Sequence, residues 1–365
     1  MKNSRRFEAG FEVFRVLAAV VIGYAIALLM LFLISNNPFY VIRQFVVGPF
    51  TSIRRFGDVI ALAIPLMFTG LCMCFMYAIN KFNLIAEGTV SLSGCLITWL
   101  ALSMAGSGLP SVPTIIIVLV VAGLVGAACS YIPAVLEQKF NANVCVVSLM
   151  LNYVLFYITQ YILNYVIKDN SVSIVASKML PKAVRLPNIV PKTGIHAGLI
   201  IVIACVVIVS FIFYKTPFGL SMRIVGHNPT FAKYIGINVS LVVVLAQVVG
   251  GIFAGLGGAV EIMGSFERFQ WTDLTNYGFD GLMVAVLART NPALVPIGAL
   301  LIAYIRSGAD IVTRTTNIPP EFVSIVQGII ILLVAAEMFL SGIKNKMIFK
   351  AAENNLQKDQ MKAKA

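Results

Sequence analysis

Long apolar runs separated by short polar connections dominate the chain. Runs at about 16–34, 58–79, 114–136, 144–166, 195–214, 239–263 and 322–340 each approach the ~20 residues that a helix needs to cross a bilayer. Further apolar stretches continue from the polar segment 81–94 to about 104, cover 277–288, and open at Asn291–Pro292. The pattern predicts an all-α, polytopic membrane protein with about ten membrane segments.

Two of the polar interruptions resemble each other. Glu87–Gly88 follows the run at 58–79, and Asp280–Gly281 follows the run at 239–263. Each acid–glycine pair opens an apolar run of small residues, and the two preceding runs cross in opposite directions. Because many transporters contain inverted repeats with helices broken at corresponding places, we interpret the pairs as an inverted pseudo-repeat with broken helices. The alternative is that both acids are ordinary helix caps at the membrane surface.

The stretch 221–239, SMRIVGHNPTFAKYIGINV, has different local chemistry from the apolar runs on either side. Asn228 can cap a helix, Pro229 suits the first helical turn, and Gly236 can adopt the left-handed conformation that ends a helix. A helix of about two turns is therefore predicted between them. The stretch is either a connecting loop that contains a short helix or a docking element for a soluble partner.

Composition supports the membrane assignment. The chain has 365 residues, of which 59% are hydrophobic and 12% charged, whereas about a quarter of a soluble protein is charged. The net charge of +12 could suggest nucleic acid, but Lys and Arg stand at segment ends and in loops, as expected beside membrane spans. We therefore expect lipid contacts and no nucleic-acid polymer as a partner. The cysteines lie inside apolar runs and are expected to be small buried hydrophobes: Cys72, Cys74, Cys95, Cys129, Cys145 and Cys205.

Sidedness follows from the number of crossings. The basic N-terminus precedes a first run that we interpret as a retained, cytoplasmic-side anchor. Ten crossings then place the segment 215–238 and the Lys-rich tail 344–365 in the cytoplasm, with residues 1–343 as one transmembrane domain. The loops at 36–57 and 168–193 would lie outside despite their basic residues.

Features of an enzyme are weak in this sequence. GxxxxGK[ST] does not occur, so the chain has no phosphate-binding P-loop of its own. His196 and His227 stand in or beside connecting segments without metal-ligand spacing, and are expected to be solvated loop residues. We predict no catalytic residue and no metal site. Glycines such as Gly251 and Gly255, four residues apart, are expected to let helices approach closely.

Four separated motifs resemble one transporter family. They are RIVGHNPTFAKYIGIN at 223–238, PLMFTGL at 65–71, FNLIAEG at 82–88 and YGFDGLMVAVLARTNP at 277–292, and they occur in family order. Together they are similar to ABC importer permeases of the branched-chain amino acid and ribose type. The N-terminal region with GPF at 48–50 most resembles the nucleoside branch, which is associated with basic membrane proteins. The sequence departs from the family at Ile85, Thr89 and His227, which bears on the substrate more than on the transporter class.

The resemblance implies a permease subunit of a bacterial inner membrane. This subunit would have no ATPase site of its own. A partner ATPase would bind ATP and Mg²⁺, a second permease subunit, homologous or identical, would complete the pore, and an extracytoplasmic solute-binding lipoprotein would deliver the solute. ATPase coupling is then assigned to Arg223, Gly226, Asn228, Pro229, Ala232, Lys233 and Gly236. The misplaced basic residues outside would either meet carboxylates of the binding protein or contact lipid headgroups: Arg54, Arg55, Lys178, Lys182 and Arg185.

The solute pathway is predicted to include Asn83, Glu87, Asn152, Tyr153, Phe279 and Asp280. Phe82, Tyr153 and Phe279 could stack a nucleobase, with Asn83 and Asn152 as hydrogen-bonding groups. Alternatively, these aromatic residues serve helix packing. Nucleosides are the expected solute, while sugars, riboflavin and branched-chain amino acids remain open. A rival class, a proton-coupled secondary carrier built on Glu87 and Asp280, would not need a capped cytoplasmic helix.

Overall fold

The computed structural model describes residues 37–105 and 110–316, together with residues 25, 32, 325 and 328. The chain divides into two compact units, one of residues 46–308 and one of residues 1–45 with 309–365. Apart from those single positions, the predicted runs at 16–34 and 322–340 and the tail at 344–365 lie outside the described residues.

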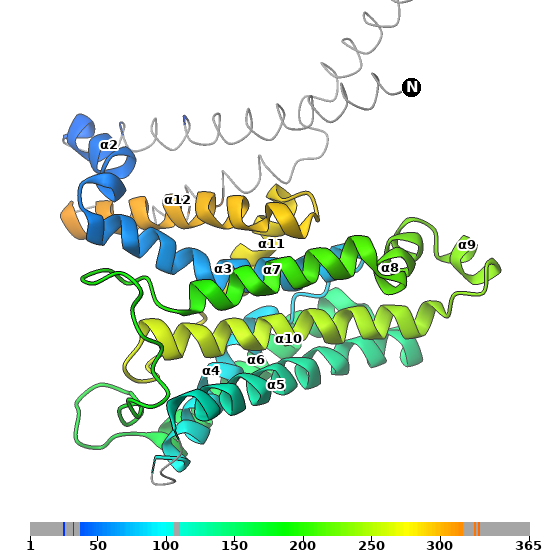
Figure 1. Ribbon diagram of the computed structural model, residues 1–365, viewed down its shortest axis with the longest axis horizontal. Helices are drawn as coiled ribbons and strands as arrows, with labels where there is room; N and C mark the ends of the chain where they lie inside the picture. The colour runs from blue at the N-terminus through cyan, green and yellow to red at the C-terminus, as the bar shows by residue number, and fades with distance from the viewer. Residues whose placement is uncertain are drawn as a thin grey trace, which may run out of the picture. The chain divides into compact units, whose positions relative to one another are not determined.

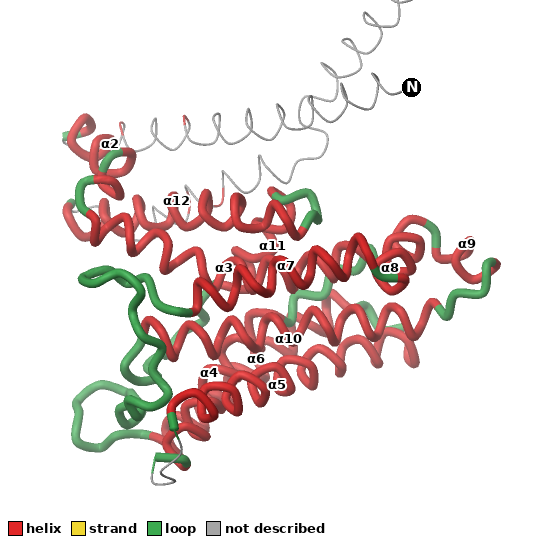
Figure 2. The backbone as a smooth tube through the Cα atoms, viewed as in Figure 1, coloured by secondary structure: helices red, strands yellow, loops and turns green. Residues whose placement is uncertain are grey.

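Helices make up most of the described part of the chain, and the rest of that part is loops and turns without a strand (Figure 2). They are α2 (Pro38–Val46), α3 (Ile53–Ala78), α4 (Ala86–Ser103), α5 (Ser111–Phe140), α6 (Val144–Ile162), α7 (Gly198–Lys215), α8 (Pro217–His227), α9 (Pro229–Tyr234), α10 (Val239–Ser265), α11 (Tyr277–Leu287) and α12 (Val295–Thr315). Short 3₁₀ turns lie at Gly48–Phe50 and Pro292–Leu294, and α6 ends in a π-helical turn, η2 (Leu163–Ile167).

Within the described residues, 6 helices are long and apolar enough to cross a membrane: Ile53–Ala78, Ser111–Phe140, Val144–Ile167, Gly198–Lys215, Val239–Ser265 and Pro292–Thr315. Each coincides with a predicted apolar run. The all-α membrane fold is therefore confirmed, while the number of about ten segments is not. The helices α4 and α11 also occupy predicted positions, and both begin after a break in the chain.

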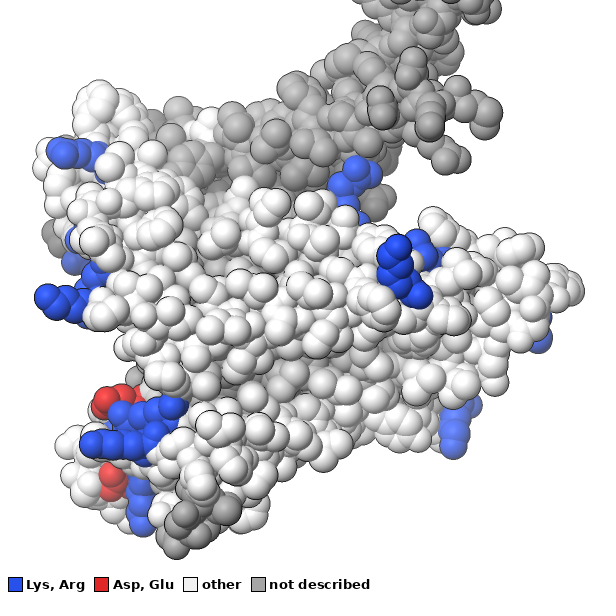
Figure 3. Space-filling view, in the orientation of Figure 1, with Lys and Arg blue, Asp and Glu red and all other residues white. Residues whose placement is uncertain are grey.

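The long helices α3, α5, α7 and α10 run lengthwise through the 46–308 unit (Figure 1). At one end, α8 and α9 follow α7. Lys and Arg side chains on the face drawn in Figure 3 lie near the helix ends, and the surface over α7 and α10 between them is uncharged among the described residues. This distribution suits a bilayer across the middle of the helices.

Aromatic side chains fill the interior between these helices. Phe75 of α3 stacks on Phe253 of α10 with ring centroids 5.8 Å apart, and meets Phe213 of α7 edge-on at 4.9 Å. Buried aromatic pairs of this geometry add to the free energy gained from apolar burial. Four of the cysteines are buried as expected, whereas Cys145 and Cys205 are half-buried.

Glycines bring α5 and α10 into backbone contact. A Cβ added at Gly126 would overlap the carbonyl oxygen of Gly251, and one added at Gly255 would overlap the carbonyl oxygen of Ala122. Ser93 of α4 also donates a hydrogen bond to the Gly255 carbonyl at 2.8 Å. The predicted close approach at Gly251 and Gly255 is thus confirmed, with α5 as the partner helix.

The connection at 168–197 packs on the last turn of α10 and on the segment that follows it. The backbone N–H groups of Ser177, Leu180 and Leu186 donate to carbonyl oxygens at Phe269, Glu267 and Met263 at 2.8–2.9 Å. Arg185, predicted to meet a binding protein, forms an ion pair with Glu267 at 3.0 Å. Its charge is therefore partly balanced within the chain.

His196 corrects one expectation. It is fully buried before α7, not solvated. Its Nδ1 accepts a hydrogen bond from the Gly198 N–H at 3.2 Å, and burial lowers the pKa of its imidazole to about 4. The ring packs directly against Gly198 and Gly264, where an added Cβ would overlap it. His227 is exposed, as expected.

Replacing Gly126 with Ala should destabilise the protein. The new methyl group would overlap the α10 backbone, and backbone cannot move aside as a side chain can, so a cost of about 1–3 kcal/mol is expected. Thermal unfolding of the detergent-solubilised protein measures it. Gly123→Ala on the same helix is the matched control, since its Cβ would meet only the Ile252 side chain, at 3.2 Å. Equal unfolding midpoints for both variants would contradict the assigned backbone contact.

Candidate functional site

The break between α3 and α4, residues 79–85, is held by buried amide side chains. Asn83 Nδ2 donates to Gln247 Oε1 of α10 at 2.6 Å, while its Oδ1 accepts from the Ile85 N–H at 3.0 Å. Gln247 in turn donates to Glu137 of α5 at 3.2 Å. Buried polar groups need such partners, so Asn83 ties the irregular backbone to two neighbouring helices.

Asn152 of α6 bonds the other side of the same break. Its Oδ1 accepts from the Gly88 N–H at 2.9 Å, and its Nδ2 donates to the Leu84 carbonyl at 2.7 Å. One N–H group in the first turn of α4 and one carbonyl of the break before it are therefore satisfied by α6. Both amides have a structural role here, and solute contact by Asn83 and Asn152 stays a prediction.

Glu87 lies fully buried in the first turn of α4 and reaches the start of α11. Its Oε1 accepts from the Asn276 N–H at 2.7 Å and from Thr275 Oγ1 at 3.1 Å. Its Oε2 accepts from the Gly278 N–H at 2.7 Å. A carboxylate at this position satisfies free N–H groups and faces the positive end of the α11 dipole.

The two interrupted helices thus meet through their N-terminal ends. A Cβ on Gly278 would overlap the backbone of Glu87, so only glycine allows this approach. Asn276 takes a left-handed conformation, with φ 62°, just before α11. The Glu87–Gly278 contact brings the two segments that carry the acid–glycine pairs together.

This junction lies along the length of α3 and not at its end. A Cβ on Gly281 of α11 would overlap Thr69, which stands 16 residues after Ile53 and 9 before Ala78 in α3. At about 1.5 Å per residue, those separations are about 24 and 14 Å. Glu87 and Asp280 are 0% and 9% exposed. In the chain as described they are buried acids within the helix bundle and not caps at its surface.

Asp280 belongs to a second polar cluster on the other side of α11. Arg306 of α12 donates to Asp280 Oδ2 at 2.8 Å and to the Thr275 carbonyl at 2.9 Å. Its guanidinium lies 5.0 Å from the ring centre of Tyr277, whose hydroxyl donates to Glu261 of α10 at 3.2 Å. One guanidinium therefore holds the first turn of α11 by an ion pair, a backbone bond and a cation–π contact.

Sequence reasoning missed Arg306, Tyr277 and Glu261. The signal was present, because an acid placed inside an apolar bundle needs a cation, and Arg306 interrupts the apolar run that follows Asp280. The predicted aromatic residues are not gathered at the junction. Phe279 is half-buried on α11, and Tyr153 is exposed on α6.

The segment 215–238 has the predicted caps. Asn228 Oδ1 accepts from the Phe231 N–H at 2.9 Å, α9 begins at Pro229, and Gly236 has φ +85°. Sequence reasoning missed α8, which begins at Pro217 after the cap Thr216. The short helix predicted at 229–235 is confirmed, apart from its last residue.

Side chains of α8 and α9 divide into a packed and an exposed set. Ala232 is buried, and a Cβ on Gly226 would overlap the carbonyl oxygen of Ala78 at the end of α3. Arg223 lies over the Tyr214 ring at 5.5 Å. The exposed set includes Phe231, Lys233, Tyr234 and Ile235. Exposed apolar side chains thus lie beside a lysine at this end of the helices.

Replacing Asp280 with Ala should destabilise the protein and lower its transport. Arg306 would lose the carboxylate that lies 2.8 Å from its guanidinium, and breaking a buried pair costs about 3–5 kcal/mol. The double variant Asp280→Ala with Arg306→Met should lose less stability than the single one, because it removes the guanidinium together with this carboxylate. Thermal unfolding and solute uptake measure both effects. Asp273→Ala, which removes an exposed acid of the same connection, is the control; an equal loss there would contradict the role of the ion pair.

Comparison with known proteins agrees with this architecture. The family model described as "Branched-chain amino acid transport system / permease component" matches residues 55–335. The chain is similar to the guanosine ABC transporter permease protein NupP of Bacillus subtilis, with 29% identity over 84% of this chain and 88% of the relative. It is also similar to the nucleoside ABC transporter permease protein NupB of Lactococcus lactis, with 26% identity over 94% and 96%. The glucose ABC transporter permease protein TsgB13 of Haloferax volcanii shares 29% identity over 96% and 93%.

Proposed function

Since the chain belongs to the permease components of the branched-chain amino acid transport system family, we propose that it forms the membrane pathway of an ATP-driven importer for nucleosides. As a member of this family, it is a multi-pass cytoplasmic membrane protein and not itself an enzyme. ATP and Mg²⁺ belong to the partner ATPase, and this chain needs no cofactor.

Two of the relatives support the choice of nucleosides. They are named as guanosine and nucleoside permeases, and they align over most of the chain. The glucose permease relative keeps a sugar as the alternative solute. The ribose part of a nucleoside and a free sugar share hydroxyl chemistry, whereas only the nucleoside carries a flat aromatic base.

Coupling to the ATPase is assigned to the surface of α8 and α9. Contacts lead inward from it, since Gly226 of α8 packs on the end of α3, and the break after α3 carries Asn83 and leads into the first turn of α4 with Glu87. A pull on α8 and α9 would therefore act on the helix that ends directly before the break. Arg223, Gly226, Asn228, Pro229, Ala232, Lys233 and Gly236 build or display this surface.

The proposed architecture has ten membrane segments in one domain, residues 1–343, followed by the basic tail 344–365 on the cytoplasmic side. Helices α4 and α11 are the corresponding half-helices of an inverted repeat. A second permease subunit completes the pore, and a solute-binding lipoprotein docks outside, where basic residues such as Arg54 and Lys182 would meet its carboxylates.

The solute pathway is proposed to pass the junction of α4 and α11. Glu87 and Asp280 lie at that junction, and ionisable groups inside a membrane commonly mark a transport path. The other proposed pathway residues are Asn83 of the break before α4, Asn152 and Tyr153 of α6, and Phe279 of α11. The acids have partners within the chain, so they act by holding the half-helices in place.

The docking assignment is tested by removing the exposed apolar residues of α9. The double variant Phe231→Ala with Tyr234→Ala should lower the affinity for the ATPase by at least about tenfold, because a few buried aromatic anchors carry most interface energy. Co-purification from solubilised membranes and ATP-dependent guanosine uptake are the measurements.

Phe140→Ala is the matched control, since Phe140 is 72% exposed at the end of α5 and lies outside α8 and α9. Unchanged co-purification of the double variant would contradict the docking assignment. Guanosine uptake that continues without the ATPase and depends on a proton gradient would show a secondary carrier and contradict the proposed ATP-driven importer.

A further inference from the structure

Four exposed tyrosines follow one another along α6 and η2. Tyr153, Tyr157, Tyr161 and Tyr165 are spaced by four residues and are 56%, 68%, 62% and 78% exposed. Residues four apart on a helix lie on neighbouring positions of one face. We refer to these four residues as the tyrosine ladder.

The ladder differs from the outward faces of the neighbouring helices. Exposed residues of α5 and α7 are mainly aliphatic, such as Ile116, Val120, Ile203 and Val207. Aliphatic faces suit lipid. A tyrosine hydroxyl inside hydrocarbon has no partner, and tyrosines of membrane helices gather at the interfaces.

The length of the ladder excludes a single interfacial belt. From Tyr153 to Tyr165 the helix rises about 18 Å, more than half of a hydrocarbon layer of about 30 Å. Hydroxyl groups are therefore presented at several depths. Hydroxyl groups at several depths suit an aqueous path beside α6 better than a lipid contact.

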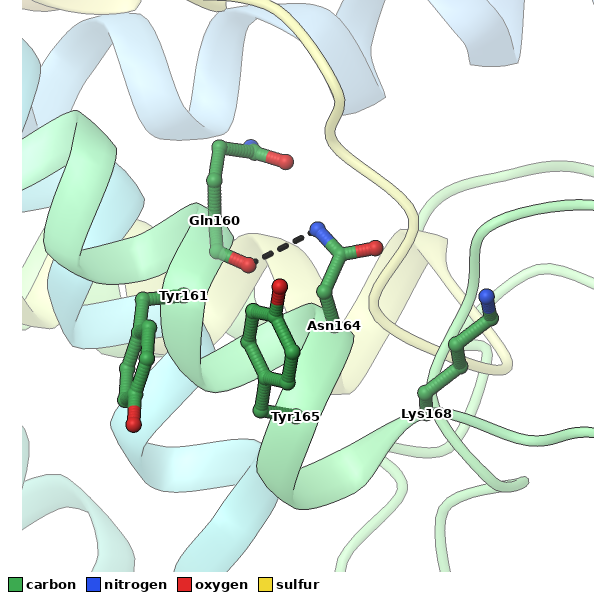
Figure 4. Close-up of a pocket in the computed structure, with 5 residues that line it drawn as sticks. All are labelled: Gln160, Tyr161, Asn164, Tyr165 and Lys168. Carbon is green, nitrogen blue, oxygen red and sulfur yellow. Dashed lines mark hydrogen bonds between the residues drawn. The ribbon is translucent and has the colours of Figure 1, made fainter.

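A pocket opens at the end of the ladder that lies beside the 168–197 connection. It has a volume of about 410 Å³ and is lined by Gln160, Tyr161, Asn164, Tyr165 and Lys168 (Figure 4). Ligand pockets commonly have volumes of about 300–1,000 Å³.

Local bonding orients the groups of this pocket. Gln160 Nε2 donates to the Trp271 carbonyl at 2.8 Å, and Asn164 Nδ2 donates to the Gln160 carbonyl at 2.8 Å. The rings of Tyr161 and Tyr165 lie 5.0 Å apart at 36°. Tyr165 and Asn164 stand in the π-helical turn η2, a rare conformation that is frequent at functional sites.

We propose that the tyrosine ladder is the surface on which the solute's base stacks as it enters, beginning at this pocket. The inference rests on the proposed nucleoside transport and adds the recognition element. An aromatic ring can stack on any base, at a gain of about 1–3 kcal/mol in other proteins that bind bases, and amide groups hydrogen-bond base edges. A free sugar has no aromatic base, so stacking on the ladder favours nucleosides over sugars.

Thiol labelling in the complete importer tests the exposure to water. Tyr157→Cys and Tyr161→Cys, in a chain with Cys145→Ser and Cys205→Ser, are treated in membranes with a membrane-impermeant thiol reagent. Val120→Cys and Val207→Cys are the matched controls on α5 and α7. Labelling at the ladder but not at the controls is expected, with slower labelling in guanosine and no change in glucose. Labelling no faster than in the controls, or no protection by guanosine, would overturn the inference.

Uptake kinetics separate the ring from the hydroxyl. Tyr161→Ala should raise KM for guanosine about tenfold, which is about 1.4 kcal/mol, whereas Tyr161→Phe should leave it nearly unchanged. Tyr131→Ala removes an exposed tyrosine from α5 and is the control. If the unaltered importer moves guanosine and Tyr161→Ala has the same KM as the control, the inference about the ladder fails while the proposed function stands. If the unaltered importer moves glucose but not guanosine, the proposed function fails and the inference with it.

Discussion

A broken helix inside a bilayer exposes backbone groups that no lipid can satisfy, and the structure is arranged around this constraint. The chain breaks before α4 and again before α11. Asn83 bonds the backbone within the first break, Asn152 reaches that break from α6, and Glu87 of α4 bonds the backbone at the start of α11. The helices that carry these partners are thereby fixed relative to the break.

These hydrogen bonds belong to a set of contacts that joins the α8–α9 surface to the junction of α4 and α11. α8 packs on the last residues of α3, the break follows α3, and Glu87 after the break holds the first N–H groups of α11. Arg306 then links α11 to α12, and Tyr277 links it to α10. A continuous series of contacts thus runs from the α8–α9 surface to the junction of α4 and α11.

The sequence predicted those features that depend on local chemistry. Asn228, Pro229 and Gly236 specify α9 through their own backbone preferences, and long apolar runs specify spans regardless of their neighbours. The partners of Glu87 and Asp280 depend on which segments meet in space, which one sequence does not encode locally. Arg306 and the burial of His196 were missed for that reason, as was α8, whose amphipathic pattern is short. The tyrosine spacing on α6 was readable, but its meaning required the aliphatic faces of α5 and α7 for comparison.

The glycine contact between α5 and α10 also has a genetic consequence. Every coding change in a glycine codon adds at least one carbon atom, and at Gly126, Gly251 and Gly255 that atom would meet main chain or a short buried side chain. A compensating change in a neighbour is of little help, because a carbonyl oxygen cannot be mutated away. Descendants of this gene should therefore keep glycine at these positions while the exposed positions of the same helices drift freely among aliphatic residues.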